Sequence, residues 1–313
     1  MDGQATSPNR RLNGGPPDIP GVRRSIVRAR DVDFHVTEAG SGRPVLVLHG
    51  WPQHHYEYRD LLADPPAGLR IIAPDLPGYG WSGPPPHRWR KEDIASDLLA
   101  LMDALELSEP VLLVGHDWGG WVGYLLILRA PERFRGYLSI NISHPWQTVR
   151  TAVPQLVRTL SYQPLLAVFG QFIQRRTHFI EKVMFRVGIP RDRRLPPSVV
   201  DEFASRFREP ERARAGTDTY RTFLLREVPA AVLKPERRRA QVPIRVLFGA
   251  DDLAIHPASA SPRTALADDY EFEAVPGCSH FLVDERPDLV RERLIRLAHE
   301  TDVKPPALSR SKG

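Results

Sequence analysis

Short, continuously apolar segments that alternate with helical ones constrain the fold of this chain more than any other feature. Three of them end in glycine- or proline-rich loops: RPVLVLHG, LRIIAPDLPGYG and PVLLVGHD. A strand without a polar face is buried on both sides, as in the centre of a parallel sheet. Between the last two lies RKEDIASDLLALMDALEL, whose apolar residues recur at helical spacing. The alternation predicts an α/β protein with a mostly parallel sheet flanked by helices.

The alternation stops between residues 145 and 238. This stretch contains amphipathic helical pieces such as QPLLAVFGQFIQRR and TYRTFLLREV, separated by prolines, and no strand pattern. Strand character returns at VPIRVLFGADD and YEFEAVPGCSH. We therefore expect an α/β core over residues 21–144 and 239–300, interrupted by a helical cap over 145–238. We expect the polar ends, residues 1–20 and 301–313, to be disordered.

Composition narrows the classes of protein further. No apolar run approaches the roughly 20 residues of a membrane span, and we expect no signal peptide. The single cysteine, Cys278, agrees with a reducing compartment such as the cytoplasm. The net charge is +5, but the arginine clusters PRDRRLPP and PERRRAQ are short and lack interleaved aromatic residues. We interpret them as solvated surface rather than a site for nucleic acid or membrane, and expect a monomer or a homodimer.

The sequence GHDWGG follows directly after the strand segment PVLLV and indicates a candidate catalytic residue. Gly115, Gly119 and Gly120 permit a sharp turn from strand to helix, which exposes the residue at its apex above the sheet. That residue is Asp117, at a place where many hydrolases carry a serine. The N-terminus of the following helix favours an anion, so Asp117 should be ionised. Taken alone, Asp117 is equally well explained as a helix N-cap.

Residues at two later strand ends favour a catalytic role for Asp117. A nucleophile at such an apex works with a histidine, and the histidine needs a carboxylate to orient it. Asp252 ends the strand in RVLFGADD, with Asp251 as the fallback, and His280 follows the last strand in VPGCSHFL. Asn141 occupies the other strand end at which an acid could lie. The chain order nucleophile, acid, histidine is the order expected for such a fold.

Two tryptophans are positioned to supply an oxyanion hole. The backbone N–H after the nucleophile belongs to Trp118, and the loop LHGWP offers that of Trp51. At this point HGWP, DLPGYGWS, GHDWGG, GADD and GCSHF together resemble the motifs of the α/β-hydrolase fold family, in its epoxide hydrolase branch. The resemblance extends from about Gly21 to His299 but matches the cap only at scattered points. It implies a cis peptide bond before Pro52.

The resemblance also assigns a role to two tyrosines of the cap. In epoxide hydrolases, two cap tyrosines hydrogen-bond the epoxide oxygen and protonate it. Tyr162 in SYQPLL and Tyr220 in TYRTF resemble those two positions. The alternative is that both are helix residues half-buried at the seam between cap and core. Because both occur together with a nucleophilic aspartate, we favour the role of acid.

A carboxylate suits a particular reaction, because it can attack a saturated carbon directly and displace an alkoxide or a halide. Water activated by His280 then hydrolyses the resulting ester, with no metal and no organic cofactor. We therefore predict an epoxide hydrolase for a small apolar epoxide. The cap phenylalanines that agree with an apolar substrate are Phe169, Phe172, Phe179 and Phe223. The alternatives are a haloalkane dehalogenase with the Trp118 indole as halide ligand, and a non-catalytic small-molecule binder.

Other candidate residues are expected to be structural. His49 should hold its loop by hydrogen bonds, and His116 should point away from the apex. His54 and His55 should be surface or loop residues. Trp146 is the only tryptophan at the entrance to the cap that could serve as a second halide ligand, and we expect it to line the pocket instead.

Overall fold

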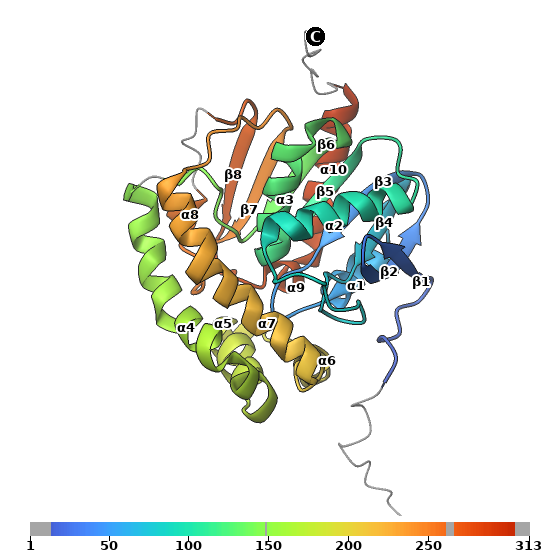
Figure 1. The fold of residues 1–313 in the computed structure, drawn as a ribbon. Helices are drawn as coiled ribbons and strands as arrows, with labels where there is room; N and C mark the ends of the chain where they lie inside the picture. The colour runs from blue at the N-terminus through green and yellow to red at the C-terminus, as the bar shows by residue number, and fades with distance from the viewer. Residues whose placement is uncertain (1–13, 148, 261–265, 304–313) are drawn as a thin grey trace, which may run out of the picture.

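The computed structural model describes residues 14–147, 149–260 and 266–303, and it has the predicted α/β architecture (Figure 1). Eight strands form one sheet in the order β1-β2-β4-β3-β5-β6-β7-β8. Strands β4, β3, β5, β6, β7 and β8 are parallel neighbours, whereas the hairpin β1–β2 is antiparallel and joins the sheet through β4. The strand bounds are β1 (Arg23–Ala29), β2 (Val32–Gly40), β3 (Arg43–Leu48), β4 (Leu69–Pro74), β5 (Val111–His116), β6 (Phe134–Ile140), β7 (Ile244–Gly249) and β8 (Tyr270–Val275).

Helices cover both faces of the sheet and explain the continuously apolar strands. In β3, Leu46 and Leu48 pack into the cluster that includes α2 (Lys91–Ala104) and α3 (Asp117–Arg129). Val45 and Val47 point the other way, into the cluster of α1, α9 and α10. Successive strand residues face opposite sides, so a strand covered on both sides needs apolar residues throughout. The bounds of these last helices are α1 (Arg59–Ala63), α9 (Leu282–Glu285) and α10 (Pro287–Val303), and short 3₁₀ turns form η1 (His55–Tyr58), η2 (Pro131–Arg133) and η6 (Pro257–Ser259).

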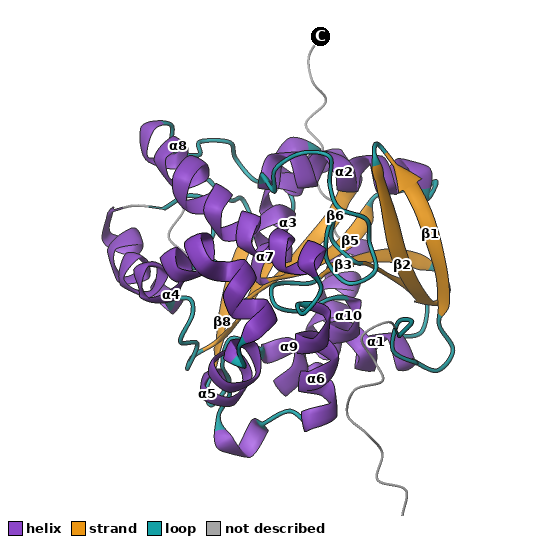
Figure 2. Ribbon diagram, turned by 60° about the horizontal axis from the view of Figure 1, so that its bottom comes forward, coloured by secondary structure: helices purple, strands orange, loops and turns teal. Residues whose placement is uncertain are grey.

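The chain between β6 and β7 is helical, and its helices gather on one side of the sheet (Figures 1 and 2). The longest, α4, lies along α7 and provides most of the packing within this insertion. Its elements are α4 (Val149–Arg176), the π-helical turn η3 (Ile180–Phe185), α5 (Arg186–Gly188), η4 (Arg191–Arg193), α6 (Pro197–Arg206), α7 (Pro210–Thr222), the π-helical turn η5 (Phe223–Glu227) and α8 (Val228–Leu233).

Prolines begin helices of the insertion as the sequence predicted, since α6 starts at Pro197 and α7 starts at Pro210. Pro164 is an exception. Helix α4 runs without a break through Pro164. A proline in a helix interior removes one backbone hydrogen bond and usually bends or ends the helix. Here Leu166 and Ile173 bury the inner side of α4, and the Arg221 guanidinium of α7 donates to the Ala167 carbonyl at 3.0 Å. Packing along α7 therefore holds α4 together across the proline.

The expected disordered ends lie largely outside the described residues, namely at 1–13 and 304–313. Within the described chain, Ile19 is buried among core residues. Helix α10 extends to Val303, beyond the expected core boundary at residue 300. Across the described residues, none of the helices combines the length and the apolar character that a bilayer span requires.

Candidate functional site

Four predicted site residues lie at the carboxyl ends of neighbouring parallel strands. Asp117 follows β5, Asp252 follows β7, His280 follows β8 and Trp51 follows β3. The carboxyl ends of parallel strands meet at one edge of the sheet, which is where α/β proteins place their ligand sites. Asp117 has a φ of 46°, in the left-handed region that non-glycine residues seldom adopt. This strained backbone at the apex of the strand-to-helix turn points to a functional residue.

Two glycines allow the loop after β3 to approach the apex of this turn. A Cβ atom on Gly119 would lie 2.4 Å from the carbonyl oxygen of His49, and a Cβ atom on Gly50 would lie 2.4 Å from the side-chain Cβ atom of Asp117. Both distances are far below van der Waals contact, so only glycine fits at either position. The close approach places the Trp51 backbone N–H 2.9 Å from Oδ2 of Asp117, to which it donates. The sequence-predicted cis peptide bond between Trp51 and Pro52 is present.

The Asp117 carboxylate is buried among groups that act on its charge in opposite directions. Burial raises the pKa of Asp117 above its usual value, because the charged form loses its hydration. The nearby imidazole of His280 opposes this effect, as do hydrogen bonds from the backbone N–H groups of Trp51 and Trp118. These two N–H groups are the donors that the sequence predicted for an oxyanion hole.

The imidazole of His280 links the two carboxylates. Its Nε2 atom lies 3.6 Å from Oδ1 of Asp117, and its Nδ1 atom lies 2.8 Å from Oδ2 of Asp252. Asp252 is buried, whereas the fallback candidate Asp251 is exposed and contacts neither residue through its side chain. Burial alone would raise the pKa of Asp252, but the His280 imidazole, together with hydrogen bonds from Asn141 and the Ile255 backbone, outweighs it and holds the pKa below the usual range.

Asn141 is a member of the site that the sequence did not identify as functional. It follows β6, and its amide Nδ2 donates to Oδ2 of Asp252 at 2.8 Å. The other carboxylate oxygen of Asp252 accepts the backbone N–H groups of Ala254 and Ile255, at 2.7 and 2.8 Å. Every oxygen of this buried carboxylate is therefore occupied by donors, which fixes its orientation toward His280. The only sequence cue to Asn141 was its place at a strand end.

The two tyrosines that the sequence selected, Tyr162 and Tyr220, lie together in the insertion, next to the residues that follow the strand ends. The ring of Tyr220 on α7 lies 5.2 Å from the Trp51 ring and 5.6 Å from the Trp118 ring, and the ring of Tyr162 on α4 lies 5.9 Å from that of Tyr220. Burial raises the pKa of both phenols. The next largest cause is the charge of Asp117 for Tyr162 and the charge of Tyr162 for Tyr220. Both side chains are therefore protonated at neutral pH and can donate a proton.

Three indole N–H groups near the site differ in their partners. That of Trp51 donates to the side-chain oxygen of Gln174 on α4 at 3.0 Å, and that of Trp146 donates to the Arg238 carbonyl at 2.9 Å. The Trp146 ring packs against Tyr124. No contact within the described part of the chain joins Trp146 to Asp117, Asp252 or His280, so the expectation that it lines the pocket stays a prediction. The Trp118 indole N–H is buried and forms no short hydrogen bond with a described residue, but it lies close enough to the Tyr220 hydroxyl to act on the pKa of that phenol, which it lowers against the effect of burial.

Lys91 is a buried cation beside the site that sequence reasoning missed. Its Nζ atom donates to the Thr219 carbonyl at 2.8 Å, pairs with Glu227 at 2.9 Å and lies 4.4 Å from the ring centre of Trp118. Burial lowers the pKa of Lys91, and the Glu227 carboxylate opposes this. Lys91 thus connects the start of α2 to the insertion next to Tyr220. No sequence cue distinguishes it from an ordinary solvated lysine at a helix N-terminus.

The phenylalanines of the insertion divide into two groups. Phe223 packs on Trp118 with ring centres 5.0 Å apart, and Phe179 is half-buried. Phe169 and Phe172 instead face solvent, with exposed fractions of 58% and 64%. The prediction that all four serve an apolar pocket or core is therefore wrong for Phe169 and Phe172, because they lie on the outer side of α4.

Two of the remaining histidines behave as predicted. His49 Nε2 accepts the backbone N–H of Leu76 at 2.9 Å and so holds its loop. His116 is turned away from Asp117, since its Nε2 contacts the His280 carbonyl at 2.8 Å and its Nδ1 lies 3.1 Å from Glu57. Burial would lower the pKa of His116, but the Glu57 carboxylate outweighs it and raises the pKa to about 9.

The expected surface position of His54 and His55 is wrong, because both are fully buried. His55 and His35 each place Nδ1 2.9 Å from an oxygen of Asp75, and His54 packs on Trp81. The segment is polar in sequence, but Asp75 of the loop after β4 supplies partners that make its burial favourable. These groups are close enough to hold a metal ion. Their mutual hydrogen bonds account for the arrangement, so we interpret the cluster as structural.

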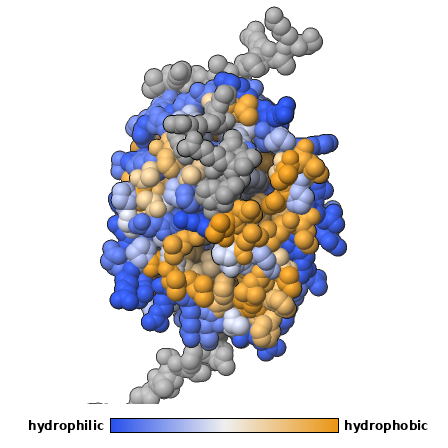
Figure 3. Space-filling model, turned by 90° about the vertical axis from the view of Figure 1, so that its left-hand side faces the viewer, coloured by the Kyte–Doolittle hydropathy of each residue, from blue (hydrophilic) through white to orange (hydrophobic). Residues whose placement is uncertain are grey.

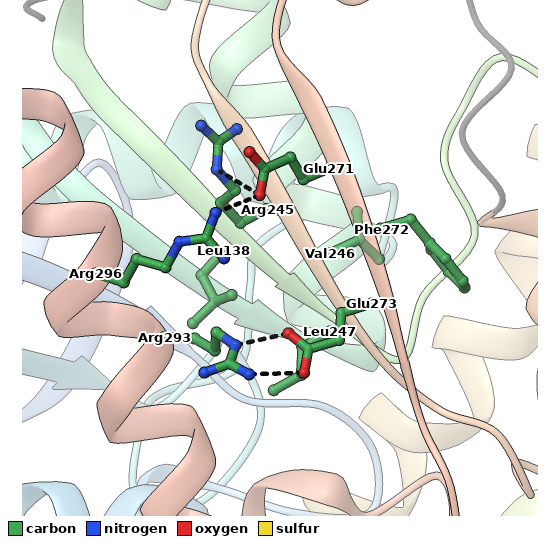
Figure 4. A pocket seen from close by; sticks show the side chains of 9 residues that line it. All are labelled: Leu138, Arg245, Val246, Leu247, Glu271, Phe272, Glu273, Arg293 and Arg296. Atoms are coloured by element: carbon green, nitrogen blue, oxygen red, sulfur yellow. Dashed lines mark hydrogen bonds and ion pairs between the residues drawn. The ribbon is translucent and has the colours of Figure 1, made fainter.

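A separate pocket of about 190 Å³ lies between β7, β8 and α10 and shares no lining residue with the triad (Figure 4). Its arginines are already paired. Arg293 forms two hydrogen bonds to Glu273, at 2.6 and 2.7 Å, and Arg296 pairs with Glu271 at 2.7 Å. Because these arginines are paired with carboxylates and no nucleophile lines the pocket, we take the strand-end site, and not this pocket, as the candidate active site.

Comparisons with known proteins identify the family of this fold. Residues 43–287 match the family model of the alpha/beta hydrolase fold. The chain is 38% identical to an epoxide hydrolase of Caballeronia sordidicola over 125 residues, which are 39% of this chain and 38% of that relative's length. It is 28% identical to epoxide hydrolase 4 of Mus musculus over 280 residues, 84% of this chain and 76% of that protein. The fold is similar to the crystal structure of an epoxide hydrolase from Vigna radiata, with a TM-score of 0.72, 23% identity and coverage of 89% of this chain and 98% of that one.

Proposed function

The chain belongs to the α/β-hydrolase fold family, on its epoxide hydrolase branch, and from this premise we propose that it hydrolyses a small apolar epoxide to a vicinal diol through an ester on Asp117. The observation that carries the proposal is the pairing of a buried carboxylate at the strand-to-helix turn with two protonated phenols above it. Only an alkoxide leaving group requires such acids, because a halide leaves without a proton.

In the first step, an oxygen of the Asp117 carboxylate attacks a carbon of the epoxide ring. The C–O bond of the ring breaks, and the departing oxygen takes a proton from Tyr162 or Tyr220. The helix N-terminus and the two backbone N–H groups support the ionised nucleophile. The site is buried, so these dipoles act with little screening by water.

In the second step, His280 removes a proton from water, and the resulting hydroxide attacks the ester carbonyl of Asp117. The negative charge that develops on this carbonyl oxygen lies beside the N–H groups of Trp51 and Trp118, each of which can contribute roughly 10²–10³-fold in rate. Asp252 holds the imidazole in the tautomer that accepts a proton at Nε2 and stabilises the imidazolium. The tetrahedral intermediate then collapses: the ester C–O bond breaks, and the leaving alkoxide takes the proton of the newly added hydroxyl, which leaves Asp117 as a carboxylate. The proton held by His280 returns to the tyrosine that was deprotonated in the first step, and the diol is released.

A haloalkane dehalogenase is the second candidate, favoured by the buried indole N–H of Trp118, which forms no short hydrogen bond with a described residue. A halide ion needs donors to hold it, and a second indole would be the natural complement. The indole N–H groups of Trp51 and Trp146 are already bonded to Gln174 and Arg238. The Trp118 indole is therefore the one indole of the three without a short hydrogen bond to the described chain. Together with the phenols of Tyr162 and Tyr220, this favours an epoxide substrate over a haloalkane. The third alternative, a non-catalytic binder, would not form an ester on Asp117.

A paired assay tests the proposal: styrene oxide and a bromoalkane are offered separately, and diol and bromide release are followed. We expect diol from the epoxide, no turnover by Asp117→Ala, and an alkyl adduct on the aspartate in His280→Gln, detected by intact mass. Bromide release without diol would favour the dehalogenase. Turnover by Asp117→Ala would remove the aspartate from the mechanism, and binding without any adduct would leave only the binder.

A further inference from the structure

The outer side of helix α4 exposes a row of apolar side chains. Its members, Val157, Leu160, Leu165, Val168, Phe169 and Phe172, have exposed fractions between 46% and 71%. Together they occupy one broad side of the helix, opposite the side that Leu166 and Ile173 bury, and they are turned away from α7. A surface helix ordinarily presents polar residues on that face, so this row is the reverse of the expected pattern.

The end of the insertion adds to this apolar surface. Leu225 of η5 and Val232 and Leu233 of α8 have exposed fractions of 70%, 76% and 82%. Figure 1 places α4 and α8 on the same side of the molecule, and Figure 3, which looks onto that side, shows apolar residues gathered across it. We call the row on α4 together with these three residues the cap face. Large contiguous apolar patches on a protein surface mark sites of interaction.

Charge is distributed very unevenly between the insertion and the rest of the chain. Residues 145–238 hold 18 lysines and arginines against 9 aspartates and glutamates, whereas the remaining residues hold 25 against 29. The net charge is therefore +9 in the insertion and −4 elsewhere, so the modest total of +5 conceals a strongly basic region. Such asymmetry indicates an anionic partner for the basic part.

Several of these cations lie beside the exposed apolar residues and have no carboxylate partner among the described residues. Arg176 ends α4, Arg226 follows Leu225, and Lys234 follows Leu233. All three side chains are exposed, and no ion pair joins any of them to a described residue. Lys182 and Arg186 are also exposed, and no ion pair joins either of them to a described residue. They lie next to the exposed Val183 and Val187.

We propose that the cap face docks onto the surface of an anionic lipid bilayer. Aliphatic and aromatic side chains can enter the acyl boundary while flanking lysines and arginines meet the headgroups. A second copy of the chain would oppose two faces of the same positive sign, and nucleic acid would offer no apolar phase for the row on α4. This proposal does not depend on the epoxide chemistry.

Vesicle co-sedimentation tests the proposal with the full chain. We expect binding to vesicles of phosphatidylcholine mixed with phosphatidylglycerol, little binding to phosphatidylcholine alone, and weakening as salt is raised. The double variants Phe169→Gln/Phe172→Gln and Arg226→Glu/Lys234→Glu should each reduce partitioning by more than about tenfold. Ile26→Gln on β1, an apolar side chain 62% exposed but distant in the fold from the insertion, is the matched control and should bind like the wild type.

Equal partitioning onto both kinds of vesicle, or none onto either, would overturn the proposal. So would a dimer detected by light scattering that Phe169→Gln/Phe172→Gln abolishes without vesicle binding by the wild type, because the occupant would then be a second copy. Asp117→Ala should bind vesicles as the wild type does. A failure of the epoxide mechanism and a failure of membrane docking are therefore seen in different measurements.

Discussion

Replacement of Asp252 by asparagine should separate the two steps of the proposed reaction. In the wild type, Oδ1 of Asp252 accepts two backbone N–H groups, and Oδ2 accepts the Asn141 amide and faces Nδ1 of His280. The two backbone donors will hold the amide oxygen of the variant, so its NH₂ group takes the place of Oδ2. His280 then faces a donor, and its ring is driven to the tautomer that carries the proton on Nε2 and cannot accept one from water.

The size of the effect follows from the role of this contact. Loss of the correct tautomer and of the charge that stabilises the imidazolium lowers turnover by about 10⁴-fold in the serine-protease triad, which corresponds to about 5.4 kcal/mol of activation free energy. The first step uses Asp117 and the tyrosines and leaves His280 aside. Attack on the epoxide should therefore retain its rate while ester hydrolysis is lost.

Rapid-quench mass spectrometry measures both steps directly. In Asp252→Asn the mass of the protein should rise by one epoxide within the first turnover and then persist, whereas in the wild type the adduct should decay. Asp251→Asn is the matched control, because the neighbouring carboxylate is exposed, and this variant should turn over normally. Equal loss of both steps, or a normal rate of ester hydrolysis in Asp252→Asn, would refute the assignment.

Further predictions concern the acids, the buried lysine and stability. Replacing Tyr162 and Tyr220 together by phenylalanine should slow ester formation by about 10²–10⁴-fold in stopped-flow tryptophan fluorescence; an unchanged rate would remove them as acids. Lys91→Met should lower the free energy of unfolding by about 2 kcal/mol in urea titrations, since a buried hydrogen-bonded cation is lost; an unchanged midpoint would contradict its buried role. The Glu57 carboxylate raises the pKa of His116 to about 9. The ion pair between them therefore contributes its full share to the free energy of unfolding below pH 6.5, and this stabilisation is lost as the pH rises through 9. Between pH 6.5 and 9, the free energy of unfolding of the wild type should fall by up to about 3 kcal/mol more than that of Glu57→Gln. Parallel pH profiles of the two proteins would exclude a stabilising ion pair between Glu57 and His116.

The strand-end residues could be placed from sequence because each depends on a local pattern. An apolar run followed by a glycine turn marks where a strand ends, and parallel strands bring those ends to one edge. Asp117, Asp252 and His280 needed nothing more to be expected as neighbours. The two cap tyrosines are different, since helical periodicity alone leaves them indistinguishable from packing residues, and only the likeness to a family selected them.

Contacts between distant segments could not be predicted. His54 and His55 look exposed because their neighbours are polar, yet their burial depends on Asp75, which arrives from another strand. Gln174 meets the Trp51 indole across 123 residues of chain. A local window measures polarity and not the availability of a partner, so buried polar side chains with remote partners are the ones it misplaces.

Trp51 joins the two parts of the chain through a single residue: its backbone N–H serves the nucleophile, and its indole is held by Gln174 of the insertion. Gly216 permits this contact, since a Cβ atom there would lie 2.2 Å from the Gln174 side-chain oxygen. The insertion is therefore no freely interchangeable module. A chimera that grafts the helices of another hydrolase onto this core must carry a glutamine and a glycine at these places. Without them, laboratory recombination that aims only at a new substrate pocket will also disturb the loop that faces the reacting carboxylate.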